Sequence, residues 1–199
     1  MNFWDQQFAG SEFRYGTAPN AYLTRQAHVL PPRARVLVPG DGEGRNSVWL
    51  AQQGHHVLAM DASAVGLDKA RALAAERGVV IRTVLADLAD WQPEEGVFDA
   101  VVLTFVHLPP ALRTSAHRRL ARALRPGGRL LLQAFHPSQL GRPSGGPKQL
   151  DMLYTLADLQ SDFADMLDQE DGEELEVELD EGPGHQGLAR VTRYLARRR

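Results

Sequence analysis

A glycine-rich turn between a predicted strand and a predicted helix constrains this chain more than any other stretch. Residues 35–38 read Arg-Val-Leu-Val, and glycines then stand at the alternate positions Gly40, Gly42 and Gly44. A helical pattern begins at Ser47. Glycine permits positive φ angles and lets a ligand lie against the main chain, and the first amides of a helix attract anionic or polar groups. The stretch therefore predicts a strand, a tight turn and a helix N-terminus at a ligand site.

An acidic residue follows at the distance expected for a nucleotide-binding βαβ unit. The apolar run 56–60 ends at Asp61, about 20 residues after the turn. In such units an acid at this place binds the ribose hydroxyls. The alternative is an ordinary turn in which Asp61 only caps the next helix. The glycines and the acid together favour a nucleotide site.

The rest of the chain alternates between predicted strands and helices. After the first strand, strands are expected at 56–61, 79–86, 98–104 and 129–135, and helices at 18–30, 44–53, 64–77, 110–125 and 156–167. Alternating runs at 174–180 and 188–193, joined by a turn at 181–187, predict a terminal antiparallel hairpin. The fold class is therefore α/β, with a doubly wound, mostly parallel seven-stranded sheet. Its strands would end, and ligands would bind, at one edge.

Length and composition exclude several classes of function. A chain of 199 residues that is 43% hydrophobic suits a single domain with a substantial core. The absence of cysteine excludes disulfides, thiolate metal sites and cysteine nucleophiles. A formal net charge of −3 gives no overall attraction to nucleic acid or to an anionic membrane. With no membrane span or signal-peptide pattern, the protein is expected to be cytoplasmic.

Three details separate the two kinds of nucleotide site that share these features. A dinucleotide site spaces its glycines as Gly-x-Gly-x-x-Gly, but Arg45 stands where that pattern would be completed. The third predicted strand ends at Asp87, which can bind an adenine amino group. A hairpin replaces the second mononucleotide half. These details favour an adenosyl ligand without a second nucleotide and disfavour a dehydrogenase.

At these positions the sequence resembles the class I S-adenosylmethionine-dependent methyltransferases, over residues 13–140. The terminal hairpin fits the last two strands of that family. Within the class, residues 36–40 (Val-Leu-Val-Pro-Gly) resemble the thiopurine and thiol methyltransferases, and residues 44–47 (Gly-Arg-Asn-Ser) resemble the tellurite-resistance methyltransferases. Both groups methylate chalcogen atoms. The resemblance implies a Rossmann-like fold, S-adenosylmethionine as cofactor and S-adenosylhomocysteine as product.

The resemblance also implies a set of cofactor-binding residues. The glycine loop would lie beneath the methionine part, Asp61 would bind the ribose, and Thr104 would lie beside the sulfonium. The full implied set is Tyr15, Gly40, Asp41, Gly42, Gly44, Arg45, Asn46, Asp61, Ala62, Asp87, Leu88 and Thr104. The family often has an acid where this chain has Val38, so Asp41 or a water would supply that hydrogen bond.

Three histidines are expected near the ligand edge of the sheet. His107 follows the fourth strand, His136 follows the fifth, and His185 lies in the hairpin turn. A histidine can take a proton from an alcohol, phenol or amine acceptor, although each could instead only satisfy local backbone. The tellurite-type resemblance places His185 on the substrate side, with Gln186 where that group has a basic residue. The predicted catalytic residues are His185, His107 and Tyr15, and no metal site is predicted.

The sequence thus predicts one methyltransferase domain over residues 1–199. Its parts are an N-terminal lid and helix (1–30), a cofactor-binding core (31–140), and a substrate loop, helix and hairpin (141–199). The aromatic-rich residues 1–17 either close as a lid or cover the sheet edge. The predicted reaction is in-line methyl transfer to a small molecule, with a sulfur, selenium or tellurium nucleophile favoured.

Three alternatives to this function stay open. One is an O- or N-methyltransferase with a histidine base, and another is a non-catalytic protein that binds S-adenosylmethionine or S-adenosylhomocysteine. A nucleic-acid methyltransferase is disfavoured, because residues 104–107 lack the Asn/Asp-Pro-Pro-aromatic tetrad of enzymes that methylate base amino groups. Four arginines do have near-helical spacing, as in a phosphate-binding stripe: Arg118, Arg122, Arg125 and Arg129. The oligomeric state is not predicted.

Overall fold

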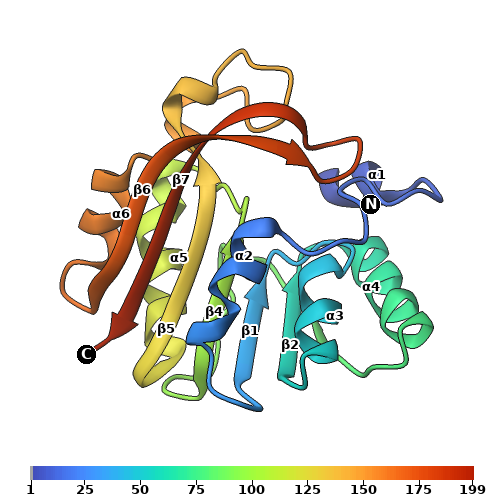
Figure 1. The fold of residues 1–199 in the computed structure, drawn as a ribbon, viewed down its shortest axis with the longest axis horizontal. Coiled ribbons are helices and arrows are strands. Elements are labelled where there is room, and N and C mark those ends of the chain that lie inside the picture. Colours follow the sequence, from blue (N-terminus) through green and yellow to red (C-terminus); the bar gives the residue numbers. More distant parts are fainter. Residues whose placement is uncertain (1) are drawn as a thin grey trace.

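The computed structural model describes residues 2–199 and contains one seven-stranded sheet (Figure 1). The strands are β1 (Arg35–Pro39), β2 (His56–Asp61), β3 (Arg82–Leu85), β4 (Phe98–Thr104), β5 (Leu124–Phe135), β6 (Leu167–Asp180) and β7 (Gln186–Arg198). Their order is β3-β2-β1-β4-β5-β7-β6. Strands β1 to β5 pair in parallel, and β7 pairs antiparallel with both β5 and β6. The predicted fold class is confirmed.

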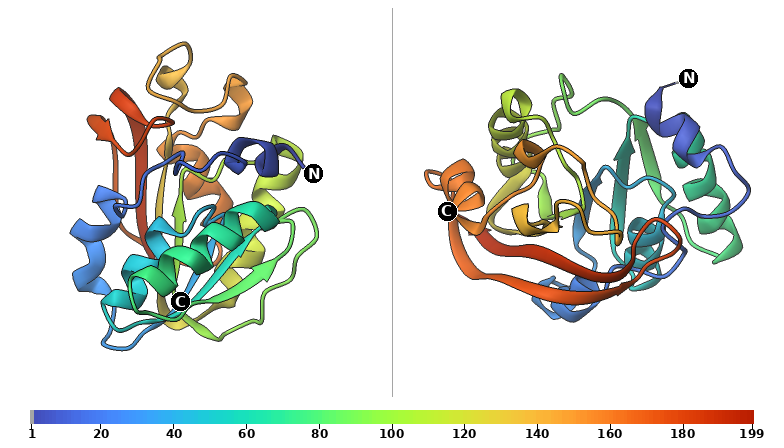
Figure 2. Two further views of the ribbon diagram at one scale, coloured as in Figure 1. Left: turned by 90° about the vertical axis from the view of Figure 1, so that its right-hand side faces the viewer. Right: turned by 90° about the horizontal axis from the view of Figure 1, so that it is seen from above.

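Helices cover both faces of the sheet (Figures 1 and 2). They are α1 (Phe3–Phe8), α2 (Ala21–Gln26), α3 (Arg45–Gln52), α4 (Ala64–Glu76), α5 (Pro110–Ala123) and α6 (Leu156–Phe163). Short 3-10 helices occupy residues 27–29, 137–139 and 150–152. Val36 and Val38 of β1 pack on the side of α2 and α3, whereas Leu37 between them packs on the side of α5 and α6. The strand is apolar from Val36 onward because alternate side chains enter opposite cores.

The terminal hairpin is much longer than the alternating runs at 174–180 and 188–193 predict. Strand β6 begins at Leu167. Its first half is acidic and lacks the alternation of apolar and polar residues that indicates a strand. A register shift between Gln169 and Asp171 interrupts the two-residue period there. Strand β7 continues to Arg198, and residues 191–196 are buried on both faces because β7 lies inside the sheet between β5 and β6.

Several other boundaries differ from the predicted ones for local reasons. The strand expected at 79–86 begins only at Arg82, because the amide of Val79 bonds to the carbonyl of Ala74 and closes the end of α4. The helix expected at 18–30 is shortened by Asn20, whose side chain caps α2. Helices α5 and α6 end at Ala123 and Phe163, before the predicted ends at 125 and 167. The side chain of Ser63 caps α4 by accepting a hydrogen bond from the amide of Gly66.

Two segments far apart in the sequence meet above the carboxyl ends of the parallel strands. The amide of Gly184, in the turn between β6 and β7, donates to the carbonyl of Arg14 at 2.8 Å. Gly182 lies so close to Gly16 that a Cβ atom on Gly182 would collide with the Gly16 backbone. Figure 2 shows the tip of this hairpin beside the N-terminal segment. The turn and residues 14–16 therefore pack against each other and together cover this edge of the sheet.

Within residues 2–199 the structure contains no helix with the length and apolar character needed to span a membrane.

Candidate functional site

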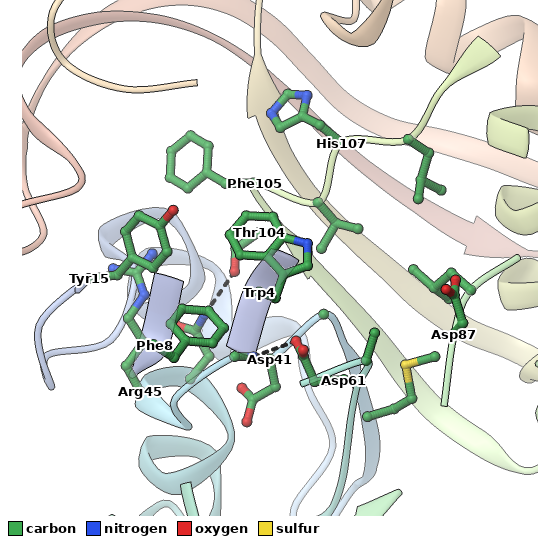
Figure 3. A pocket seen from close by; sticks show the side chains of 18 of the residues that line it. Trp4, Phe8, Tyr15, Asp41, Arg45, Asp61, Asp87, Thr104, Phe105 and His107 are labelled. Atoms are coloured by element: carbon green, nitrogen blue, oxygen red, sulfur yellow. Dashed lines mark hydrogen bonds between the residues drawn. The ribbon is translucent and has the colours of Figure 1, made fainter. Parts of the chain in front are cut away.

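A cavity of about 210 Å³ opens at the carboxyl ends of β1, β2 and β4 (Figure 3). It is lined by Trp4, Phe8, Tyr15, Gly40, Asp41, Gly42, Arg45, Asn46, Met60, Asp61, Ala62, Ala86, Asp87, Leu88, Thr104, Phe105, Val106, His107, Leu108 and His185. Every residue that we predicted for cofactor binding or catalysis lines this cavity, with the exception of Gly44. The structure therefore brings the predicted set together.

The glycine loop passes beneath the cavity in a conformation that other residues rarely adopt. Gly40, Gly42 and Gly44 have φ values of 64°, 61° and 93°. A Cβ atom on Gly40 would lie 2.7 Å from Cγ2 of Val106 in the facing wall. A Cβ atom on Gly44 would lie 2.6 Å from Cα of Ala70, so Gly44 serves the packing of the loop against α4 rather than the cavity. Gly40 and Gly42 therefore allow Val106 and Phe8 to pack close to the loop, and both present only backbone to the cavity.

Asp61 holds this loop at the end of β2. Its Oδ2 accepts a hydrogen bond from the amide of Gly42 at 2.8 Å, and its Oδ1 accepts one from the amide of Ser63 at 2.8 Å. Burial raises the pKa of Asp61, and the backbone amides partly oppose this effect. Each carboxylate oxygen has a further lone pair. Asp61 can therefore bind ligand hydroxyls while it fixes the loop.

The carboxyl group of Asp41 is hydrogen-bonded to the start of α3. It accepts hydrogen bonds from the amide of Ser47, at 3.2 Å, and from the Ser47 hydroxyl. Asp41 thus caps the N-terminus of α3. The residue at the N-cap position is Gly44, which has no side chain to do so. Burial raises the pKa of Asp41 to about 7. The hydrogen bond that we expected between Asp41 and a ligand stays a prediction, since Asp41 also lines the cavity, and Val38 lies buried in the core.

Asn46 and Asp87 lie at opposite ends of the cavity. The Asn46 side chain donates to the Thr104 hydroxyl at 2.7 Å and accepts from the amide of Asn20 at 2.9 Å. It therefore fixes Thr104 at the end of β4. Asp87 is exposed at the end of β3, and its Oδ1 accepts from the amide of Ala89 at 2.8 Å. Its other oxygen stays free for the adenine contact that we predicted.

A buried charged cluster lies beside the glycine loop. Arg45, at the start of α3, places Nη2 2.7 Å from Oε2 of Glu181. Oε1 of Glu181 accepts from Nδ2 of Asn20 at 2.8 Å, and Nδ1 of His185 lies 3.8 Å from Oε2. Nη1 of Arg45 is buried and has no hydrogen-bond partner within residues 2–199. An unpaired guanidinium nitrogen at a cavity wall fits the carboxylate of a ligand.

Glu181 was missed by the sequence prediction. It directly follows β6, at the start of the turn predicted at 181–187, and no local pattern separates it from the exposed acidic residues before it. In the structure it is only 8% exposed.

Aromatic rings surround His185 at the other end of the cavity. The ring centroids of Tyr15, Phe105 and Phe135 lie 4.3, 4.5 and 5.2 Å from that of His185. Phe105 has a φ of 57°, which is rare and costly for an aromatic residue. This turn directly after β4 directs the Phe105 ring toward His185. No pattern in the sequence indicates this role.

The aromatic residues of α1 lie over the glycine loop. Phe8 is buried, and a Cβ atom on Gly42 would come within 3.1 Å of its ring. Trp4 stacks on Phe8 with centroids 5.6 Å apart and lines the cavity. Asp5 fastens the segment by accepting from the Ser63 hydroxyl at 2.7 Å. Residues 2–17 therefore cover the ligand edge, and whether they open as a lid stays a prediction.

The geometry does not support His107 as a general base. Its Nδ1 lies 2.6 Å from the carbonyl of Met152, to which it donates, so Nε2 accepts the amide of Phe135 at 3.2 Å. Both ring nitrogens are thus bound to backbone. His136 caps the 3-10 helix at 137–139 through the amide of Ser138, and it does not line the cavity.

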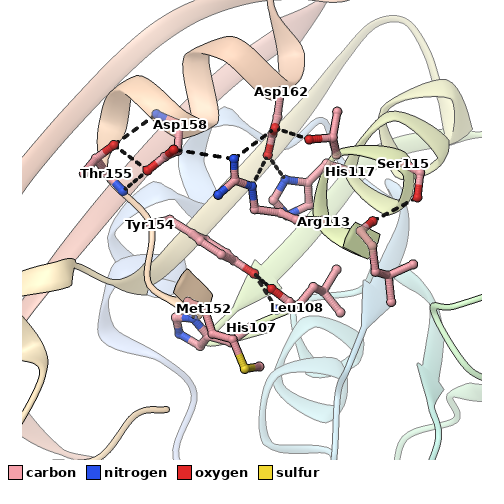
Figure 4. Close-up of polar contacts among 12 residues, drawn as sticks. His107, Leu108, Arg113, Ser115, His117, Met152, Tyr154, Thr155, Asp158 and Asp162 are labelled. Atoms are coloured by element: carbon pink, nitrogen blue, oxygen red, sulfur yellow. Dashed lines mark hydrogen bonds and ion pairs between the residues drawn. The ribbon is translucent and has the colours of Figure 1, made fainter. Parts of the chain in front are cut away.

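The wall behind His107 is braced by a polar network between α5 and α6 (Figure 4). Asp162 accepts hydrogen bonds from Arg113, Thr114 and His117 at 2.9, 2.7 and 2.8 Å. The hydroxyl of Tyr154 bonds to the backbone of Leu108, next to His107. His117 is buried in this network. The network fixes the segment after β4 in place.

Stability is expected to depend on pH through His107. Burial lowers the pKa of His107 from 6.5 to about 4. Between these values the unfolded chain binds a proton that the folded chain does not, so stability falls as pH falls. The full contribution is about 3 kcal/mol. Urea unfolding at pH 7 and pH 4.5 should show a smaller pH effect in His107→Gln than in the parent, whereas exposed His28→Gln should follow the parent. Equal pH effects in both variants would contradict the assignment.

Comparisons with known proteins show what this chain is similar to. Residues 36–128 match a family model described as a methyltransferase domain. The chain is 29% identical over 115 residues to 2-heptyl-1-hydroxyquinolin-4(1H)-one methyltransferase of Mycobacteroides abscessus, covering 56% of this chain and 51% of that protein. It is 28% identical over 189 residues to thiopurine S-methyltransferase of Pseudomonas putida, covering 83% and 87%. The chain thus spans about half the length of the first of these relatives.

A solved structure has the same fold over nearly the whole chain. It was described for the conversion of a disulfide bond into a thioacetal group during echinomycin biosynthesis. The TM-score is 0.78, and the match covers 98% of this chain and 90% of the other at 21% identity. At this identity the likeness establishes the fold.

Proposed function

We propose that this chain, which contains a class I S-adenosylmethionine-dependent methyltransferase domain, transfers a methyl group to a small molecule with a sulfur, selenium or tellurium nucleophile. The observation that carries the proposal is the continuous cavity from Asp87 past the glycine loop to Thr104 and His185. It offers an adenosyl end and an acceptor end within one enclosure. We also propose that the domain acts in the cytoplasm.

The residues present fit S-adenosylmethionine. Gly40 and Gly42 present backbone without a Cβ atom to the cavity, Asp61 can accept from the ribose hydroxyls, and the unpaired Nη1 of Arg45 suits the carboxylate of the methionine part. When bound, the cofactor supplies an activated methyl group on a sulfonium. The contribution of the chain is to orient the acceptor in line with that group and to exclude water.

The acceptor end favours a soft nucleophile. Its walls are the rings of Tyr15, Phe105 and His185 together with Val106. Sulfur makes favourable contacts with aromatic rings, and a thiolate needs little base catalysis. The names of the thiopurine relative and of the echinomycin structure also concern sulfur chemistry. An oxygen or nitrogen acceptor is the second candidate, because His185 could remove its proton.

A nucleic-acid substrate is less well supported by the arginines of α5 and β5. Of the four arginines with near-helical spacing, Arg118 pairs with Asp165, Arg125 with Asp99 and Arg129 with Glu170. Arginines that bind carboxylates of their own chain do not form a free phosphate-contacting stripe.

Calorimetric titration with S-adenosylhomocysteine, beside NAD as a control, tests the cofactor. We expect micromolar binding of S-adenosylhomocysteine and none of NAD, and a preference for NAD would contradict the proposal. Methyl transfer from S-adenosylmethionine should then be assayed with thiols, chalcogen oxyanions, phenols and amines. Turnover with thiols is the expected result. Binding without transfer to any of these acceptors would favour the non-catalytic alternative.

A further inference from the structure

We infer that Glu181 is a positioning residue, which holds His185 with its proton on Nδ1 and leaves Nε2 to accept a proton from the acceptor. The inference rests on the proposed function. It adds that the methyl acceptor is protic, which means that the atom to be methylated carries a hydrogen. It depends on the buried cluster of Arg45, Asn20, Glu181 and His185.

The turn between β6 and β7 brings the side chains of Glu181 and His185 close together. The amide of Glu181 donates to the carbonyl of His185 at 2.9 Å, and the amide of His185 donates to the carbonyl of Gly182 at 3.1 Å. The two residues therefore belong to one closed turn, which is tied to the carbonyl of Arg14 through Gly184. In this turn Nδ1 of His185 lies 3.8 Å from Oε2 of Glu181. Such contacts often shorten when a ligand is bound.

Glu181 is held in the ionised state. Burial acts to raise the pKa of Glu181, but His185 and Arg45 outweigh this effect, so its pKa lies below the usual value. Asn20 fixes its other oxygen at 2.8 Å. An ionised carboxylate accepts hydrogen bonds and donates none. The nitrogen that faces it, Nδ1, is therefore favoured as the protonated one.

No other group competes for Nδ1. This atom is buried and has no hydrogen-bond partner within residues 2–199. The opposite edge of the ring faces the loop at Gly145, where a Cβ atom would lie 2.7 Å from Cδ2 and 3.5 Å from Nε2. The rings of Tyr15, Phe105 and Phe135 hold the imidazole between them. His185 thus contrasts with His107, whose two nitrogens are both bound to backbone.

A protic acceptor gives this arrangement a chemical role. When the hydrogen-bearing atom of the acceptor forms a bond to the methyl carbon, the bond between that carbon and the sulfonium sulfur breaks, and the acceptor must lose its proton. Nε2 of neutral His185 can take that proton, and the resulting imidazolium is stabilised by the carboxylate of Glu181. An acceptor that is already an anion would gain nothing from the pair.

The tautomer of His185 can be measured without turnover. In the full chain, imidazole nitrogen shifts from NMR should place the His185 proton on Nδ1, and in Glu181→Gln they should show a mixture or the Nε2 form. The matched control is Glu178→Gln, at an exposed residue near the end of the preceding strand β6, which should leave the tautomer unchanged. A parent protein with its proton on Nε2 would overturn the inference, even if S-adenosylhomocysteine failed to bind and the proposed function were wrong.

Turnover with two thiols provides the second readout. With 2-mercaptoethanol, which is mostly protonated at neutral pH, kcat should fall about tenfold in Glu181→Gln, whereas thiophenol, which is largely ionised, should be affected much less. Loss of the carboxylate should also move the acidic limb of the pH profile lower, because Glu181 raises the pKa of His185 against the effect of burial. The charged or titratable groups around His185 are Glu181, Arg45, Arg14, Tyr15 and His107. Equal losses with both thiols would indicate a merely structural role and overturn the inference.

Discussion

Asp61→Ala is expected to weaken the binding of S-adenosylhomocysteine by about 100-fold, or ~3 kcal/mol. The carboxylate has two tasks that alanine cannot perform. It fixes the glycine loop through the amide of Gly42, and it faces the cavity where the ribose hydroxyls are expected. The change should appear in calorimetric titration of both proteins.

Two further variants test whether the loss of affinity depends on the carboxylate of Asp61. Asp61→Asn keeps one carbonyl oxygen, so it should lose less affinity than the alanine variant. Asp68→Ala removes an exposed acid of α4 that pairs with Arg71, and it should bind like the parent. Equal affinity in Asp61→Ala and the parent would remove the ribose assignment.

The parts of the site that follow from the sequence are those fixed by short-range spacing. The glycine loop and Asp61 come from one βαβ unit, where strand, turn and helix lengths leave little freedom, and the structure places them at one cavity. The resemblance to class I methyltransferases, drawn from these residues, is confirmed by the domain match and by the fold. The division into three parts of one domain stays a prediction.

The residues that could not be predicted depend on contacts between distant segments. Glu181 is buried against Asn20 and Arg45, which lie far from it in the sequence. The acidic residues that precede Glu181 give no sign of these contacts. His107 was expected to act as a base, but both of its ring nitrogens are bound to backbone groups. A sequence shows which side chains have suitable chemistry, and the fold decides which of them stay free.

The clearest separation of binding from chemistry should come from His185→Ala. We expect turnover with 2-mercaptoethanol to fall between about 10²- and 10³-fold. Affinity for S-adenosylhomocysteine should stay within about threefold of the parent, because the groups that face the cofactor are the glycine loop, Asp61 and Arg45. The reason is that His185 is the one histidine at the cavity, among residues 2–199, whose ring nitrogens are not both bound to backbone.

The control for this variant is His136→Ala, since His136 does not line the cavity. Its turnover should stay near that of the parent. Because the alanine leaves a space among Tyr15, Phe105 and Phe135, added imidazole should restore part of the lost turnover if the ring acts as a base. Unchanged turnover in His185→Ala would remove His185 from the chemistry. Lost turnover with no rescue, and with equal loss for thiophenol, would show that the ring shapes the acceptor pocket and moves no proton.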